Sequence, residues 1–265
     1  MKKSNIITFI SFAILIVIVI LIMVFWKTSS AASEPTSSPL TSRQSESTAP
    51  VTSANRFETG TTIAETTDSK PKTISMKDAL FIGDSRTVGL SEYASLNGAD
   101  FFATVGMNVY NIHKDAVSVP SVGKVTLTQL LSHKKYGKIY IMLGINELGY
   151  NVDNTVAKYK ELIDFVREKQ PDALIFVQAN LHVTKSRSDS DKVINNPAVD
   201  NLNGRLAEFA DGKTVFYLDA NPIFDDPSGN LSADKAGDSA HPYAKYYTEW
   251  GNWIVEKTAA LIEEE

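Results

Sequence analysis

Hydrophobic and polar positions follow three different patterns along this chain of 265 residues. Residues 6–26 form an apolar run of 21 residues that is interrupted only by Thr8 and Ser11. A run of that length can span the hydrocarbon core of a bilayer. Between residues 28 and 72 no strand or helix period persists, whereas from residue 73 onward apolar residues recur at the spacings of strands and helices.

The third part, residues 73–265, alternates short apolar runs with helical patterns. Five runs predict strands, at residues 79–82, 100–105, 138–143, 173–178 and 215–218. A helix is expected directly after Gly83-Asp84-Ser85, and four others at residues 125–132, 152–169, 197–210 and 242–262. The third and fourth strands are apolar almost throughout, which is typical of a sheet covered on both faces. The alternation therefore predicts an α/β fold with a five-stranded parallel sheet.

The first two parts predict an attachment to a membrane. Met1-Lys2-Lys3 precedes the apolar run and Lys27 is the only charge close behind it, which favours an amino terminus in the cytoplasm. A cleaved signal peptide is the alternative, because residues 30–32 (Ser-Ala-Ala) resemble a cleavage site, although the apolar core of such peptides is normally about 7–15 residues. We expect an uncleaved single-pass anchor at residues 1–27, which crosses the membrane through residues 6–26 and leaves the rest of the chain outside the cytoplasm.

The composition of the residues after the anchor excludes several classes of function. About half of residues 28–72 are Ser, Thr or Pro, so this part is expected to be a disordered stalk. The formal net charge of -5 gives no support to nucleic-acid binding, which requires a basic face. The chain has no cysteine, which excludes disulfides, thiolate metal ligands and a cysteine nucleophile. His113 and His133 have no partner at metal-ligand spacing, so neither a metal nor another cofactor is expected.

Residues suited to catalysis come directly after several of the predicted strands. Gly83-Asp84-Ser85 ends the first strand, Gly106 follows the second, Asn146 follows the third, and Asp238-Ser239-Ala240-His241 lies in a loop after the fifth. In a parallel sheet the carboxyl ends of the strands meet at one edge, where ligands bind. We therefore expect these loops to form one site.

The residue types in these loops suggest nucleophilic catalysis. Ser85 stands where a helix begins, so free backbone N–H groups surround its hydroxyl, although a helix-capping role is commoner for such a serine. His241 immediately precedes Pro242, which holds it in extended geometry ahead of the last helix. Asp238, three residues earlier, can reach His241 Nδ1. This predicts Ser85 as nucleophile, His241 as base and Asp238 as the carboxylate that orients it.

Two further residues are candidates for stabilising an oxyanion. The Asn146 side-chain amide can donate to developing negative charge, together with the backbone N–H groups of Ser85 and Gly106. Glycine allows the backbone at position 106 to approach closely, because it has no Cβ. Taken singly, Asn146 and Gly106 are equally well explained as ordinary turn residues.

The order Gly-Asp-Ser, Gly, Gly-x-Asn and Asp-x-x-His resembles the SGNH hydrolases, also called the GDSL family of esterases and lipases. The resemblance extends over the folded domain of about 190 residues and over none of the anchor or stalk. It implies a flavodoxin-like three-layer α/β/α sandwich at residues 73–265, and it implies the same triad and oxyanion roles. Arg86 stands where the family usually has Leu, and Glu147 where it usually has Asp. Both are candidate substrate-binding residues.

These observations predict an extracytoplasmic, membrane-anchored serine esterase of bacterial type. Its expected substrate is an O-acylated carbohydrate or another small ester, with acetyl groups on a cell-surface or other polysaccharide as the first choice. An O-acyltransferase acting on glycans with the same triad, and a non-catalytic surface-binding module, are alternatives from other classes. Four tyrosines could stack on a sugar, although a core role is the more usual interpretation of aromatic residues beside a helix. The loop at residues 179–196 could border the site, although a solvated loop is the more usual interpretation. The tyrosines concerned are Tyr150, Tyr243, Tyr246 and Tyr247.

Overall fold

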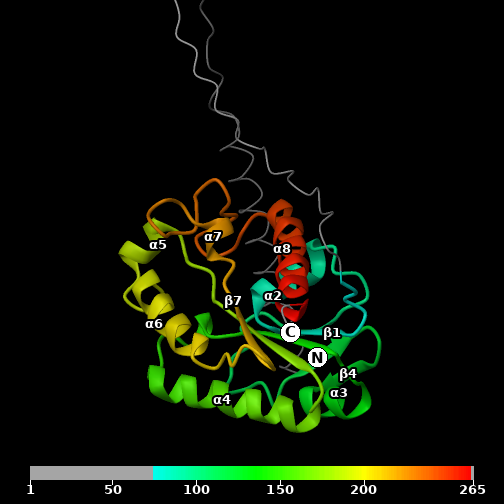
Figure 1. Ribbon diagram of the computed structural model, residues 1–265. Coiled ribbons are helices and arrows are strands. Elements are labelled where there is room, and N and C mark those ends of the chain that lie inside the picture. The colour runs from blue at the N-terminus through cyan, green and yellow to red at the C-terminus, as the bar shows by residue number, and fades with distance from the viewer. Residues whose placement is uncertain (1–73, 264–265) are drawn as a thin grey trace, which may run out of the picture. The chain divides into compact units, whose positions relative to one another are not determined.

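The computed structural model describes residues 74–263, in which a parallel sheet of five strands forms the middle layer (Figure 1). The strands lie in the order β2-β1-β5-β6-β7, and every neighbouring pair is parallel. Their bounds are β1 (Ala79–Gly83), β2 (Asp100–Ala103), β5 (Lys138–Met142), β6 (Leu174–Gln178) and β7 (Val215–Leu218). The predicted α/β fold with five parallel strands is confirmed.

Helices cover both faces of this sheet (Figure 1). On one side α3 (Leu127–His133), α4 (Val152–Lys169) and α6 (Asn196–Ala207) pack against the sheet, and on the other α2 (Ser85–Tyr93) and α8 (Ala244–Glu263) do so. Two short helices, α5 (Lys185–Ser190) and α7 (Asn221–Phe224), and the 3₁₀ turn η1 (Ile145–Glu147) lie in the loops after the strands.

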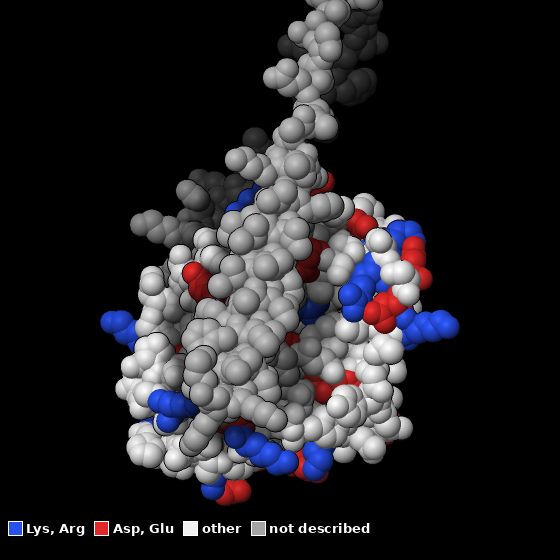
Figure 2. All heavy atoms as spheres, turned by 180° about the vertical axis from the view of Figure 1, so that it is seen from behind, with Lys and Arg blue, Asp and Glu red and all other residues white. Residues whose placement is uncertain are grey.

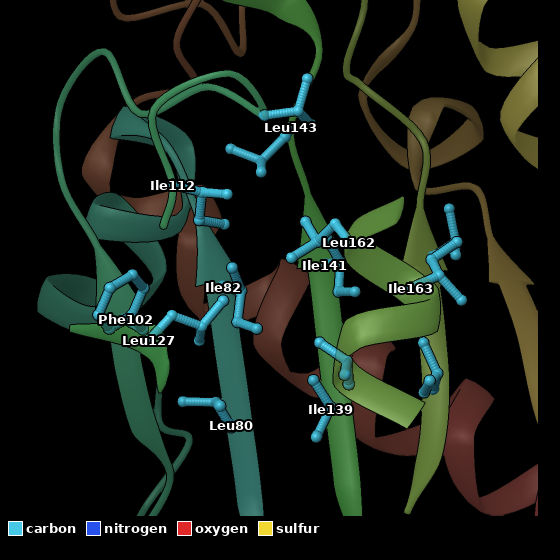
Figure 3. Close-up of a cluster of buried hydrophobic side chains, with 14 of the residues drawn as sticks. Leu80, Ile82, Phe102, Ile112, Leu127, Ile139, Ile141, Leu143, Leu162 and Ile163 are labelled. Carbon is cyan, nitrogen blue, oxygen red and sulfur yellow. The ribbon is translucent and has the colours of Figure 1, made fainter. Parts of the chain in front are cut away.

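The hydrophobic core consists of two main clusters, one on each face of the sheet, because side chains along each strand point alternately to the two faces. In β1, Leu80 and Ile82 join the cluster under α3 and α4, whereas Phe81 joins the cluster under α8. Successive side chains of a strand point to opposite faces, so a fully apolar strand supplies both. Figure 3 shows the first cluster, in which aliphatic side chains from β1, β5 and α4 interdigitate. On the other face an aromatic row crosses the strands, formed by Phe101, Phe81, Tyr140, Phe176 and Phe216.

Helix boundaries are set by local capping. The helix predicted at residues 152–169 has these bounds, because the Asn151 side chain caps its first turn. The helix predicted from residue 125 begins at Leu127 instead. Thr126 and Gln129 form a capping box there, and residues up to Thr126 belong to a strand.

That strand is part of an antiparallel hairpin missing from the prediction, formed by β3 (Ala116–Val119) and β4 (Gly123–Thr126). Neither strand is a continuous apolar run, because only alternate residues of β3 are buried and no residue of β4 is fully buried. Gly123 turns the hairpin with a φ of 87°.

The predicted anchor at residues 1–27 and stalk at 28–72 lie outside the described residues. Within residues 74–263, no helix is both long and apolar enough to cross a membrane. In Figure 2 the visible described side chains of one face mix both charge signs around the rim, without a continuous basic patch.

Candidate active site

Ser85 stands at the junction of β1 and α2. β1 ends at Gly83, and α2 begins at Ser85. The capping role belongs to Asp84, whose Oδ1 accepts a hydrogen bond from the Arg86 backbone N–H at 3.0 Å. A Cβ at position 83 would lie 2.7 Å from the Met142 carbonyl oxygen, so only glycine allows this turn. The Ser85 hydroxyl is therefore free for another partner.

That partner is His241. The distance from Ser85 Oγ to His241 Nε2 is 2.8 Å, and His241 Nδ1 lies 2.9 Å from Asp238 Oδ2. The three residues predicted to act together are thus in hydrogen-bond contact, although 156 residues separate the serine from the histidine. The loop that carries His241 closes on itself, because the Gly237 N–H donates to the His241 carbonyl oxygen at 2.7 Å.

The Asp238 carboxylate sets the tautomer of His241. Burial raises the pKa of Asp238, but hydrogen bonds from the Ala240 N–H, the His241 ring and the His241 N–H hold this pKa below its ordinary value. An ionised carboxylate only accepts hydrogen bonds, so Nδ1 carries the proton that faces it. Nε2 is then the acceptor for the Ser85 hydroxyl proton.

Arg86 ties the serine to the histidine loop. Its side chain is 1% exposed, and its Nε and Nη2 both donate to the Ala240 carbonyl oxygen, at 3.1 and 2.9 Å. A buried guanidinium bound to the residue before His241 fixes this loop against the start of α2. Arg86 is also among the residues that line the pocket at Ser85, so its contact with substrate stays a prediction beside this internal contact.

Asn146 lies in η1 and reaches toward the serine from β5. Its Nδ2 donates to the Met107 carbonyl oxygen at 3.1 Å and, at a longer 3.4 Å, to Asp84 Oδ2. Both residues beside Ser85 thus contact another loop of the site, Asp84 through Asn146 and Arg86 through Ala240. The loops are held in register around the hydroxyl.

Gly106 follows β2, the strand that pairs with β1 on the side away from β5. Its φ of 78° lies in the left-handed region, which favours glycine. Its N–H forms no hydrogen bond within the described part of the chain. It is not among the residues that line the pocket around Ser85.

Glu147, the second candidate for substrate binding, is buried away from the pocket. Its Oε1 accepts a hydrogen bond from the Val109 N–H at 2.8 Å. Burial raises the pKa of Glu147 to about 7, and the nearby Asp84 carboxylate adds to the shift. The carboxylate holds the loop after β2 against η1, so the expected substrate contact is corrected to a structural role.

A pocket of about 340 Å³ opens at Ser85 and His241. Arg187 and Ile194 line it, and both come from the excursion after β6 for which a solvated loop was the more usual interpretation. Nothing in its local pattern indicates this wall, and only its position after a central strand hints at it. The full lining is Ser85, Arg86, Ile145, Asn146, Arg187, Ile194, Asp238, Ser239, Ala240 and His241.

A second histidine anchors this excursion. His182 Nδ1 lies 2.7 Å from Asp225 Oδ2, and Nε2 lies 2.8 Å from Asp200 Oδ1. Burial alone would lower the pKa of His182, but the two carboxylates raise it to about 9. At neutral pH this ring is a charged link between β6, α6 and the end of α7.

Residues 74–263 contain no group of three or more histidine, aspartate and glutamate side chains arranged to hold a metal ion.

Comparison with known proteins finds one matching protein family and several solved structures with a similar fold. Residues 81–248 match the model of the GDSL-like lipase/acylhydrolase family, which is well over half of the chain. No curated protein matches the sequence. Three solved structures share the fold with TM-scores of 0.51 to 0.53.

The first of these is a provisionally named platelet activating factor of Streptococcus pneumoniae, 19% identical, with 69% of this chain and 83% of that chain covered and a TM-score of 0.53. The second is a GDSL-like lipase of Bacteroides thetaiotaomicron, 13% identical, with 72% and 91% covered and a TM-score of 0.52. The third is a provisionally named acylhydrolase of Bacteroides fragilis, 16% identical, with 71% and 88% covered and a TM-score of 0.51.

Proposed function

The chain belongs to the GDSL-like lipase/acylhydrolase family of ester-hydrolysing enzymes. We propose that it is an extracytoplasmic serine esterase that removes O-acyl groups from a polysaccharide, with acetyl as the preferred acyl group. The observation that carries this proposal is the 2.8 Å contact between Ser85 Oγ and His241 Nε2, with Asp238 on the other ring nitrogen. A hydroxyl in this relation to an oriented imidazole is an activated nucleophile.

In the first half of the reaction Ser85 attacks the ester carbonyl carbon while its proton passes to His241 Nε2. Ionised Asp238 stabilises the imidazolium that forms. The imidazolium then donates its proton to the leaving alcohol, and the acyl group remains on Ser85. In the second half water attacks the acyl-enzyme, and His241 accepts the proton of that water before returning it to Ser85.

Negative charge on the carbonyl oxygen needs donors, and three groups are suited to this. The Ser85 N–H lies at the first position of α2, where no backbone acceptor is available and the helix dipole favours an anion. The Gly106 N–H is free within the described residues, and the Asn146 amide is only weakly held on the Asp84 side. We assign the Ser85 N–H and the Asn146 amide, whose residues both line the pocket, to the oxyanion hole, and the Gly106 N–H, outside that lining, is the third predicted donor.

Two exposed tyrosines support a carbohydrate substrate. Tyr150 is 62% exposed and stacks on Tyr110 with ring centroids 4.9 Å apart, four residues after Asn146. Tyr243 is 48% exposed and lies two residues after His241. Tyrosine combines an apolar ring face with a polar tip, which suits a sugar ring. Tyr247, by contrast, is a buried core residue, and Tyr246 is half-buried.

The cellular location is proposed from the sequence. The apolar run at residues 6–26 behind Lys2 and Lys3 supports a single-pass anchor with a cytoplasmic amino terminus. Residues 28–72 would then hold the hydrolase domain at a distance from the extracytoplasmic surface of the membrane. Protease added to intact cells should remove the hydrolase domain and leave the amino terminus protected. Complete protection of both ends would contradict this arrangement.

The enzymatic proposal is tested with the purified full chain on p-nitrophenyl acetate and on O-acetylated polysaccharides. Ser85→Ala should abolish acetate release, and Asp238→Asn should reduce it by about 10³-fold or more because the histidine loses its orientation. Ser91→Ala is the matched control, since Ser91 lies on the same helix with its hydroxyl bonded only to Val88. Wild-type turnover by Ser85→Ala would contradict the mechanism. Acetyl transfer to a glycan acceptor without release of free acetate would indicate a transferase.

A further inference from the structure

A cationic side chain on the pocket wall has no place in the proposed mechanism. Arg187, on α5, lines the same pocket as Ser85 and His241. The other charged groups of the lining are occupied, because Arg86 is bound to Ala240 and Asp238 is bound to His241. Arg86 is also almost fully buried, at 1% exposed, whereas the Arg187 side chain is 36% exposed, so Arg187 is the lining arginine of the described pocket that is open to a ligand.

The hydrogen bonding of Arg187 leaves donors available. Its Nη2 forms an ion pair with Asp191 Oδ2 at 2.8 Å, and its side chain remains 36% exposed. Its Nε is buried and has no hydrogen-bond partner in the described part of the chain. A guanidinium carries five N–H donors in a planar fork that matches a carboxylate. Because Nε is buried, the donors left for a ligand are the N–H groups of the two terminal nitrogens that Asp191 does not use.

The segment that carries Arg187 is firmly placed. Thr184 caps α5, and its N–H donates to the Ser239 carbonyl oxygen at 3.0 Å, two residues before His241. Asp191 Oδ1 accepts the N–H groups of Val193 and Ile194, so the acidic partner of Arg187 is itself fixed by the turn. Arg187 is therefore held beside the catalytic loop.

We propose that Arg187 selects substrates in which a carboxylate lies close to the acylated hydroxyl, so that the enzyme prefers O-acylated acidic carbohydrate over neutral carbohydrate. This inference rests on the proposed esterase function. An acetyl group has no ionisable group, so the carboxylate belongs to the alcohol part of the ester. Contact with Arg187 places that part against the α5 wall of the pocket while the acyl carbon meets Ser85.

The test compares two acetate esters that differ only in charge, 3-acetoxybenzoate and 3-acetoxybenzamide. The full-chain enzyme should hydrolyse the benzoate with a kcat/KM about tenfold higher, a ratio expected for one charge-assisted contact at a partly exposed site. Arg187→Gln should bring the ratio close to 1, and Arg187→Lys should retain part of the preference. The ratio for the wild type should also fall as salt is added.

Lys185→Gln is the matched control. Lys185 lies on the same helix and carries the same charge, but it pairs with Asp189 on the surface and does not line the pocket. It should keep the wild-type ratio. Equal ratios in the wild type and Arg187→Gln, or an equal loss in both glutamine variants, would overturn the proposal. Acetylated polyuronate and acetylated xylan provide the same comparison with polysaccharides.

A separate measurement keeps this inference apart from the esterase proposal. If the wild type hydrolyses neither aryl ester, the proposed function fails, and calorimetry on Ser85→Ala then decides the role of Arg187. Binding of 3-hydroxybenzoate that is stronger than binding of 3-hydroxybenzamide, and that is lost in the Ser85→Ala, Arg187→Gln double variant, supports the anion site. Equal binding of the two compounds overturns it.

Discussion

Two histidines of this protein each contact aspartate, yet their surroundings suit opposite tasks. His241 is partly exposed, with a carboxylate on Nδ1 and a serine hydroxyl on Nε2. His182 is 9% exposed, with a carboxylate on each ring nitrogen. Both nitrogens of His182 must donate, so the ring is held as an imidazolium and cannot accept a further proton. His241 keeps one acceptor nitrogen and can move a proton.

In a histidine–aspartate pair, the group bonded to the ring nitrogen that does not face the aspartate determines whether the histidine can transfer a proton. Asp238 lies three residues before His241, so this pair is local in sequence and needs only Ser85 from elsewhere. Asp200 and Asp225 come from two separate elements, so His182 joins distant parts of the chain. Loss of the first should affect chemistry, and loss of the second should affect stability.

The largest effect is expected for His241→Gln. This substitution removes the proton acceptor, and kcat/KM on p-nitrophenyl acetate should fall by about 10⁴-fold. The side chain is partly exposed, so the thermal midpoint should change little. The measurement pairs steady-state kinetics with a thermal scan. A variant that retains a tenth of the activity would show that His241 is not the base.

His182→Gln should lower stability and leave activity nearly unchanged. It leaves Asp225, which is almost buried, without its cation, and breaking a buried pair costs about 3–5 kcal/mol of unfolding free energy. Urea unfolding measures this loss. The folded enzyme should keep kcat within a few-fold of the wild type, measured well below the unfolding midpoint. A large loss of kcat with unchanged stability would reverse the assignment of the two histidines.

The charge of His182 also predicts how stability depends on pH. Its pKa is raised from 6.5 to about 9 in the folded protein, so the folded state holds this proton more tightly than the unfolded state. The stabilisation is fully present below pH 6.5 and is lost as the pH rises through 9. Exposure of Asp200 reduces it to on the order of 2 kcal/mol. Unfolding free energies measured from about pH 6 to about pH 10 should show this decline in the wild type and lack it in His182→Gln.

The smallest effect is expected for Arg86→Leu, which introduces the usual residue of the family. Loss of the two donors to Ala240 loosens the loop that presents His241, and kcat should fall by about tenfold while KM changes little. Arg86→Lys should restore part of the rate through one remaining donor. An unchanged kcat in Arg86→Leu would show that the loop is held by its own hydrogen bonds.

Much of this protein is determined by local sequence. Near-continuous apolar strands separated by helical patterns specify the parallel sheet, and Asn151 marks the start of α4. The Asp238-x-x-His241 pair forms within one turn, so spacing alone was enough to predict its contact. The hairpin of β3 and β4 was missed because these half-exposed strands lack the continuous apolar run that marks the strands of the sheet.

Only the tertiary structure decided the tasks of residues whose partners lie far away along the chain. Arg86 and Glu147 were expected at the substrate, and both are buried: Arg86 binds Ala240 at the edge of the pocket, and Glu147 binds Val109 outside its lining. Arg187 lies at the pocket on an excursion after β6 that is held by His182 with its two aspartates and by the bond from Thr184 to Ser239. A hydrogen bond across the sheet edge depends on which loops the fold brings together, and no pattern of neighbouring residues encodes that distance. Sequence determined the chemistry available at this edge, and packing determined which side chains face the substrate.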